Sequence, residues 1–214
     1  MLIASYNFAQ TGDVLLVVLR QDSPKQAFQK KDGIVRIYNQ ENNETLGYNF
    51  FNASKYIDLQ EKNGQIRLSQ KEVSLLNNWL DSAGFTKDLV LDEEPRFVVG
   101  YVKEMQKHPD SDHLHILQVA IDENKQLQIV CGAPNIAAGQ TVVIAKVGAM
   151  MPNGALIWPG KLRGQDSFGM VCSARELGLS NAPKKRGILE LPAAQYKIGE
   201  PFDFGQAACL LAAE

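Results

Sequence analysis

The sequence lacks the features that mark exported, disulfide-linked and membrane-spanning proteins. Its three cysteines, Cys131, Cys172 and Cys209, are odd in number and widely spaced, which fits neither a disulfide framework nor a zinc site. The longest apolar run covers residues 14–19, far short of the roughly 18 residues of a membrane span. The first residues show no basic stretch and no small-residue cleavage site. We therefore expect a cytoplasmic protein that does not associate with membranes.

Catalytic and metal-binding signatures are also scarce. His113 and His115 would share one face of a strand, but no cysteine or carboxylate nearby completes a metal site convincingly. The neighbouring Asp110 and Asp112 are more typical of a solvated turn. The sequence contains no Gly-x-Ser-x-Gly elbow, phosphate-binding loop or dinucleotide fingerprint. These absences favour a binding protein over an enzyme, with no metal and no cofactor.

Charge is nearly balanced overall but concentrated locally. The chain has 22 basic and 24 acidic residues, a net charge of −2, which argues against a protein that coats nucleic acid indiscriminately. Between residues 161 and 186, however, six basic residues face two acidic ones, a net of +4. A local basic patch on a neutral protein indicates a specific partner recognised by its shape.

Residues 1–88 are predicted to form a small α+β domain. Turn residues separate four strand-like runs, at 2–8, 13–19, 33–39 and 45–52. The clearest helix follows Ser69, which forms a capping box with Glu72, and apolar residues recur at helical spacing as far as Gly84. No pattern in this domain indicates a chemical function.

The second half is predicted to be a small barrel. Residues 86–95 are acidic, end in proline and are interpreted as an interdomain linker. Short strand-like runs with glycines between them then follow at 97–102, 115–121, 127–131, 141–147 and 170–172. Many short strands with glycine at the corners are typical of a closed or nearly closed barrel. The predicted fold class is thus mainly β with α, with a barrel domain at 94–205 and a short tail at 206–214.

Four polar motifs occur in a fixed order in this second half. They are HPDSDHL at 108–114, QIVCGAPN at 128–135, KLRG at 161–164 and SFGMVCSARELGL at 167–179. This series resembles the tRNA-binding domain of the phenylalanyl-tRNA synthetase β chain, of methionyl-tRNA synthetases and of free-standing tRNA-binding proteins. With its leading domain, the whole chain is similar to the free-standing YtpR-type proteins. One departure is that Ser111 and His113 stand where the family usually has alanine and lysine.

The resemblance implies a five-stranded Greek-key OB-fold, tRNA as the partner, and a set of contact residues. These residues are Asn135, Lys161, Arg163, Ser167, Met170, Ser173 and Arg175. In an extended strand, Lys161 and Arg163 would point to the exposed side and Leu162 to the interior. Arg175 is expected at the start of a short helix. Residues 184–186 fit a solvated loop as well as a phosphate contact.

Two alternative functions stay open. The chain could be a fragment of a phenylalanyl-tRNA synthetase β chain, although that chain is several hundred residues long and carries the barrel almost at its start. It could also be a protein–protein module that forms a homodimer or docks on a synthetase through an edge strand. RNA binding that weakens with salt would favour the tRNA-binding hypothesis over the docking module, because phosphate contacts release counterions.

Overall fold

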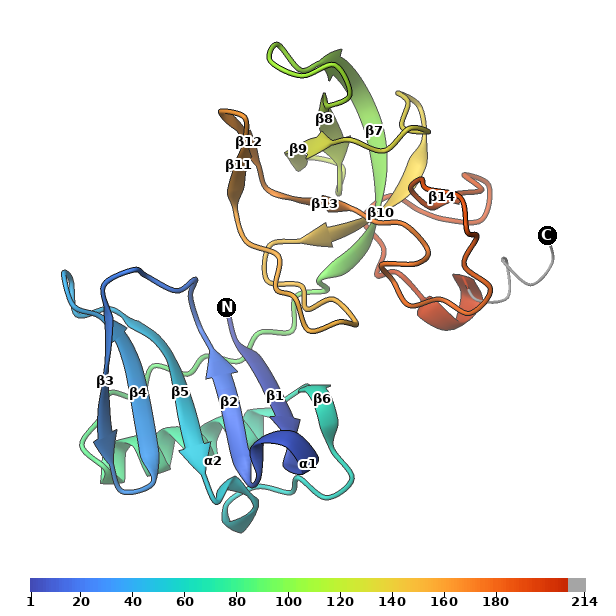
Figure 1. Ribbon diagram of the computed structural model, residues 1–214. Helices are drawn as coiled ribbons and strands as arrows, with labels where there is room; N and C mark the ends of the chain where they lie inside the picture. Colours follow the sequence, from blue (N-terminus) through green and yellow to red (C-terminus); the bar gives the residue numbers. More distant parts are fainter. Residues whose placement is uncertain (208–214) are drawn as a thin grey trace. The chain divides into compact units, whose positions relative to one another are not determined.

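The computed structural model describes residues 1–207, which form two compact units (Figure 1). The first unit is Met1–Glu94 and the second begins at Pro95. Cys209 and most of the predicted tail at 206–214 lie outside the described residues. Within the described part of the chain, no helix is long and apolar enough to cross a membrane.

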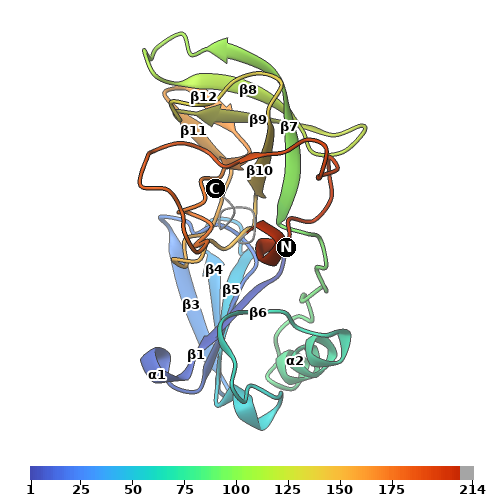
Figure 2. The ribbon, with the colours of Figure 1, turned by 90° about the vertical axis from the view of Figure 1, so that its right-hand side faces the viewer.

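The first unit is an antiparallel six-stranded sheet with a helix on one face. The strands are β1 (Ile3–Asn7), β2 (Val14–Val18), β3 (Gln26–Lys31), β4 (Ile34–Asn39), β5 (Thr45–Phe51) and β6 (Asn63–Ile66). Their order in the sheet is β3-β4-β5-β2-β1-β6. A short helix, α1 (Phe8–Thr11), joins β1 to β2, and a 3-10 turn, η1 (Ala53–Lys55), follows β5. Figures 1 and 2 show the long helix on one side of this sheet and α1 on the other.

The long helix, α2 (Gln70–Ser82), confirms the prediction made from the capping box. The Ser69 side chain accepts a hydrogen bond from the Glu72 backbone N–H, and the Glu72 carboxylate accepts one from the Ser69 N–H at 2.7 Å. Gly84 follows the helix with φ +72°, a conformation that glycine adopts without a side-chain clash. Leu76 and Leu80 then pack into the core beneath the sheet.

The segment after α2 packs back onto the first unit. Leu89 lies in its core, and the Asn77 side chain holds the Leu89 backbone by donating to its carbonyl at 2.8 Å and accepting from its N–H at 3.2 Å. The Tyr48 hydroxyl also donates to Asp88. The stretch predicted to be a linker from residue 86 is therefore integrated with the first unit as far as Asp92, whose carboxylate accepts a hydrogen bond from the Leu2 N–H at 3.3 Å. This packing could not be predicted from the sequence, because one buried leucine among acidic residues makes no recognisable pattern.

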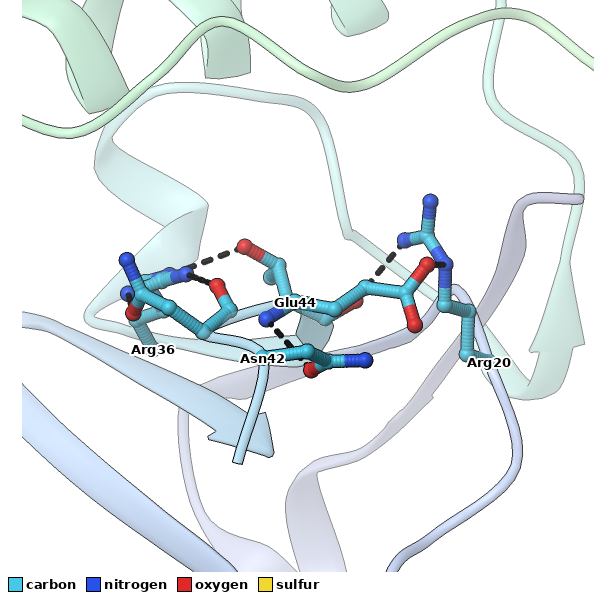
Figure 3. Close-up of polar contacts among 6 residues, drawn as sticks. Arg20, Arg36, Asn42 and Glu44 are labelled. Atoms are coloured by element: carbon cyan, nitrogen blue, oxygen red, sulfur yellow. Dashed lines mark hydrogen bonds and ion pairs between the residues drawn. The ribbon is translucent and has the colours of Figure 1, made fainter. Parts of the chain in front are cut away.

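Polar side chains fix the turn between β4 and β5 (Figure 3). Arg36 donates to the Thr45 hydroxyl at 2.8 Å and to the Asn43 carbonyl at 2.6 Å. Asn42 accepts from the Glu44 N–H, and Glu44 pairs with Arg20 from the end of β2. These contacts use the arginines internally, so we assign this cluster a role in holding the hairpin.

The second unit is an OB-like antiparallel sheet with short strands at its margins. Its strands are β7 (Phe97–Lys107), β8 (His115–Ala120), β9 (Gln126–Cys131), β10 (Thr141–Lys146), β11 (Gly160–Leu162), β12 (Gln165–Ser167), β13 (Gly169–Val171) and β14 (Glu190–Leu191). The main order is β13-β10-β7-β8-β9, with β14 on β10, and β11 and β12 form a separate hairpin. The protein is thus mainly β with α, as predicted.

Hydrogen bonds between β9 and residues 166–168, just before β13, draw together the two ends of this five-stranded order. No strand ladder joins β9 to β13 in the described residues. Instead, the Phe168 N–H donates to the Gln128 carbonyl at 2.9 Å, and the Val130 N–H donates to the Ser167 hydroxyl at 3.1 Å. The Gln128 side chain also donates to the Asp166 carbonyl. The sheet therefore curls like a barrel whose last seam is made by single hydrogen bonds.

Candidate nucleic-acid interface

A pocket of about 490 Å³ opens on the second unit where loops that carry its sequence motifs meet the end of β9. We call it the basic pocket. Its wall includes backbone and side chains from residues 113–114, 130–134, 170–171, 173–176, 183 and 185–188. Met170, Pro134 and Ile188 provide apolar surface, and Arg175, Lys185 and Arg186 provide three cations. A pocket with an apolar wall and a basic rim can hold a planar or ribose group beside a phosphate.

A tight turn at 173–176 forms one side of the basic pocket. The Ser173 hydroxyl donates to the Glu176 carboxylate at 2.6 Å and accepts from the Glu176 N–H at 3.2 Å. The Ser173 N–H donates to the same carboxylate at 2.8 Å. This is a capping-box arrangement, but the residues that follow form turns and no helix. The short helix expected at Arg175 is therefore absent, because the αL residue Gly178, φ +66°, ends the turn at once.

Arg175 supports the loop that carries the other two cations. Its guanidinium donates to the carbonyls of Pro183 at 3.2 Å and Lys184 at 2.8 Å. The Arg175 side chain is exposed and retains further N–H donors beyond these two bonds. Lys185 and Arg186, which follow directly, line the pocket. Arg175 thus links three positive charges at one rim.

Asn135 fixes the far end of the same loop. Its side-chain amide donates to the Ile188 carbonyl at 3.0 Å, and its amide oxygen accepts from the Ile188 N–H at 2.8 Å. Gly187, with φ +156°, leaves room for this approach, because a Cβ there would lie 2.7 Å from the amide oxygen. Asn135 was predicted to read a base edge, but its side chain here pairs with protein backbone. It positions the pocket wall.

The hairpin β11–β12 is attached to the loop before β8 through a buried histidine. His108 accepts from the Asp110 N–H through Nδ1 at 3.0 Å, so its Nε2–H can donate to the Leu162 carbonyl 3.1 Å away. Arg163 adds a bond from its guanidinium to the Asp110 carbonyl at 2.8 Å. These three contacts hold the KLRG motif against the HPDSDHL motif.

The strand alternation predicted for the KLRG motif is wrong. Leu162 is 40% exposed, and all three residues of β11 face solvent. Arg163 lies in the turn with φ +45°, outside the strand. Lys161 pairs across the hairpin with Asp166 at 3.3 Å. A three-residue surface strand has no buried side, so alternation did not separate its cations from its leucine.

The structure divides the predicted contact residues into four groups. Met170, Ser173 and Arg175 line the basic pocket, while Asn135 braces its loop. Lys161 and Arg163 lie on the hairpin, and neither lines the pocket. Ser167 is buried, and its hydroxyl bonds Val130 and Gly169 inside the protein.

Among the lysine, arginine and histidine side chains of the pocket, three were not in the predicted set: His113, Lys185 and Arg186. The charge run at 184–186 was visible in the sequence, but nothing there showed that the Arg175 side chain would anchor it. His113 occupies the motif position where the family usually has lysine, and it faces the pocket despite that change. Its position could have been inferred from the motif alone.

Cys131 lies in the pocket wall but is poorly suited to thiolate chemistry. Burial raises the pKa of its thiol, and the carboxylate of Glu176 adds to this effect. A thiol with a raised pKa stays protonated near neutral pH, which removes both the nucleophile and the metal ligand. Cys131 thus contributes an uncharged surface to the pocket, beside the cations and the Glu176 carboxylate that line it.

Comparison with known proteins finds a matching family for each unit and a relative that is similar over both. The second unit matches a family profile described as "Putative tRNA binding domain" over residues 97–201, and residues 21–92 match a "Domain of unknown function (DUF4479)". The "Putative tRNA-binding protein YtpR" of Bacillus subtilis is 46% identical over 202 residues, which cover 94% of this chain and 99% of that protein. The chain belongs to the YtpR family. The similarity to this family runs through both units.

Two further likenesses each cover about half of this chain. The phenylalanine–tRNA ligase β subunit of Staphylococcus aureus is 50% identical over 101 residues, 47% of this chain but only 12% of that subunit. The solved C-terminal domain of Plasmodium vivax p43 is 26% identical and covers 51% of this chain and 61% of that chain. Its TM-score is 0.36. The family resemblance expected from the four motifs is confirmed.

Proposed function

We propose that the protein binds tRNA through the basic pocket and the adjoining hairpin β11–β12, and that it acts as a binding protein in the cytoplasm, where tRNA works. The observation that carries the proposal is the clustering of Arg175, Lys185 and Arg186 at one rim of the pocket, inside the segment that matches the tRNA-binding profile. The similarity to the B. subtilis protein through both units favours this reading over a synthetase fragment.

The chemistry of the pocket suits an RNA backbone with one exposed base or ribose. Arginine forks onto phosphate oxygens, and lysine contributes a less directional charge. Met170 and Pro134 offer a polarizable and a flat apolar surface for the sugar or base. Few groups are left to read base edges, because Asn135 and Ser173 are bonded within the protein. We therefore expect weak preference among different tRNAs.

The pocket can be tested by reversing two of its charges. Lys185→Glu with Arg186→Glu should weaken tRNA binding at least tenfold, because each lost charge-assisted contact contributes on the order of 1.5–3 kcal/mol. Affinity is measured by filter binding with the full chain. The matched control is Lys103→Glu with Lys125→Glu, which makes the same change in net charge at two exposed positions outside the pocket.

The control separates a local contact from a general charge effect. We expect it to weaken binding less than threefold, through the long-range field alone. Equal losses in both double variants would contradict the assignment of the pocket. No loss in either would contradict electrostatic tRNA binding altogether.

A further inference from the structure

The sheet of the first unit has an open face opposite α2. Tyr48, Phe50, Leu15 and Val17 point toward α2 and belong to the core. Because strand side chains alternate, the intervening residues point to the other side. On that side, within residues 1–94, Figures 1 and 2 show the short helix α1 near the ends of β1 and β2, and no other element over the centre of the sheet.

The open face is apolar at its centre. Strand register places seven large apolar side chains that are at least partly exposed on it, Val14, Leu16, Val18, Phe28, Val35, Ile37 and Phe51, together with Ile3 of β1, which is buried. Phe28 is 71% exposed, and the other six of the seven are partly exposed. An apolar patch that spans four neighbouring strands exceeds the scattered exposure normal for a protein surface, and it indicates an interaction site.

The charge of the open face argues against a nucleic acid as its partner. Among the described strand positions on this side, Lys30 is the one charged side chain, and it lies over the Phe51 ring at 5.7 Å. Residues 1–93 carry ten basic and twelve acidic residues. A polyanion would thus gain little electrostatic attraction here. A mostly apolar face with a single cation at one side is instead suited to contact a second copy of itself.

One polar group sits within the apolar patch. Register places Asn49 of β5 between Val35 of β4 and Leu16 of β2. It is half-buried, and among the described residues its side-chain amide has no hydrogen-bond partner. An amide carries both donors and an acceptor, so two copies can satisfy each other across a two-fold axis.

We propose that the open face is the contact surface of a homodimer, in which two first units stack sheet against sheet with the Asn49 amides facing each other near the axis. Six strands about 4.8 Å apart, with about 3.3 Å per residue, give a face of roughly 24 by 20 Å. This area, about 480 Å² before the relief of the side chains is added, is smaller than the roughly 800 Å² that each partner contributes to a standard interface, so the proposed contact is a small one. The dimer would present two basic pockets.

Sedimentation equilibrium of the full chain, from about 1 to about 100 µM, tests this proposal. We expect a dimer of the wild type. Asn49→Asp and Asn49→Lys should each weaken dimerisation at least tenfold, because like charges then meet at the axis. An equimolar mixture of the two variants should regain the dimer, since opposite charges meet. Asn78→Asp, on the exposed side of α2, is the matched control and should dimerise like the wild type.

The variant Phe28→Ser tests the same surface independently, because a side chain this exposed contributes little to folding. This variant should weaken dimerisation at least threefold. A wild type that stays monomeric throughout the concentration range overturns the proposal. If the Asn49 variants of such a monomer also weaken tRNA binding, the open face belongs to RNA instead. A dimer unaffected by the Asn49 and Phe28 variants, or a mixture that stays monomeric, overturns the proposal too.

Discussion

At the scale of single residues, several polar side chains that a motif marks for RNA contact hold protein backbone instead. Asn135 bonds both backbone groups of Ile188, and Ser167 joins Val130 to Gly169. Their partners lie 53 and 37 residues away in sequence, so no local pattern could reveal these roles. The motif drew attention to these residues, and the fold was needed to show what their side chains contact.

Leu162 gives the first residue-level prediction. Leu162→Asp should change the free energy of unfolding by about 0.5 kcal/mol or less, because the side chain is already 40% exposed. It should nevertheless weaken tRNA binding severalfold, since it adds a negative charge beside Lys161 and Arg163. Thermal unfolding and filter binding measure the two effects. A large drop in the melting temperature would show that the hairpin is packed the other way.

Cys172 gives a prediction about pH. Burial, helped by the carboxylate of Glu176, raises the pKa of its thiol from its ordinary value of 9.0 to about 12. Because the folded thiol holds its proton longer than the unfolded one, its contribution to stability is complete below pH 9 and declines between pH 9 and pH 12.

The decline can be isolated by comparing the wild type with Cys172→Ala. Between pH 8 and pH 10, the wild type should lose about 1.4 kcal/mol more of its unfolding free energy than the variant, one pKa unit's worth of proton linkage. Urea titrations at the two pH values provide the difference. Equal losses would mean that the thiol is accessible to hydroxide in the folded protein.

At the scale of elements, helices and strands were predicted best where a local sequence pattern, such as a capping box or an apolar run, is enough to locate them. The capping box at Ser69 located the start of α2, and apolar runs located β2, β5 and β10. Sequence patterns missed β3 and β6, because these edge strands are mostly exposed and polar. They also placed a helix at Arg175, where a capping box is followed too soon by Gly178.

The seam between β9 and β12 provides a prediction at this scale. Ser167→Ala leaves the Val130 N–H without its partner in a buried setting, so it should destabilise the protein by about 1–3 kcal/mol. Urea unfolding measures the change, and Ser180→Ala at an exposed position is the control. A loss no larger than the control's would mean that water replaces the hydroxyl and that the seam does not depend on it.

At the scale of the whole molecule, a binding surface is assembled from loops that are distant in sequence. Arg175 and Asn135 hold the two ends of the loop that presents Lys185 and Arg186. The local net charge of +4 was readable from the sequence, but its gathering at one pocket depends on these long-range bonds. The same holds for the open face of the first unit, where register brings seven apolar side chains together.

The most direct test of the account is the salt dependence of tRNA binding by the full chain. If the pocket and hairpin neutralise about three to five phosphates, the logarithm of the association constant should fall against the logarithm of salt concentration with a slope of roughly −2 to −4. Lys185→Glu with Arg186→Glu should bring the slope closer to zero. A wild-type slope near zero would contradict the claim that these cations bind the tRNA backbone.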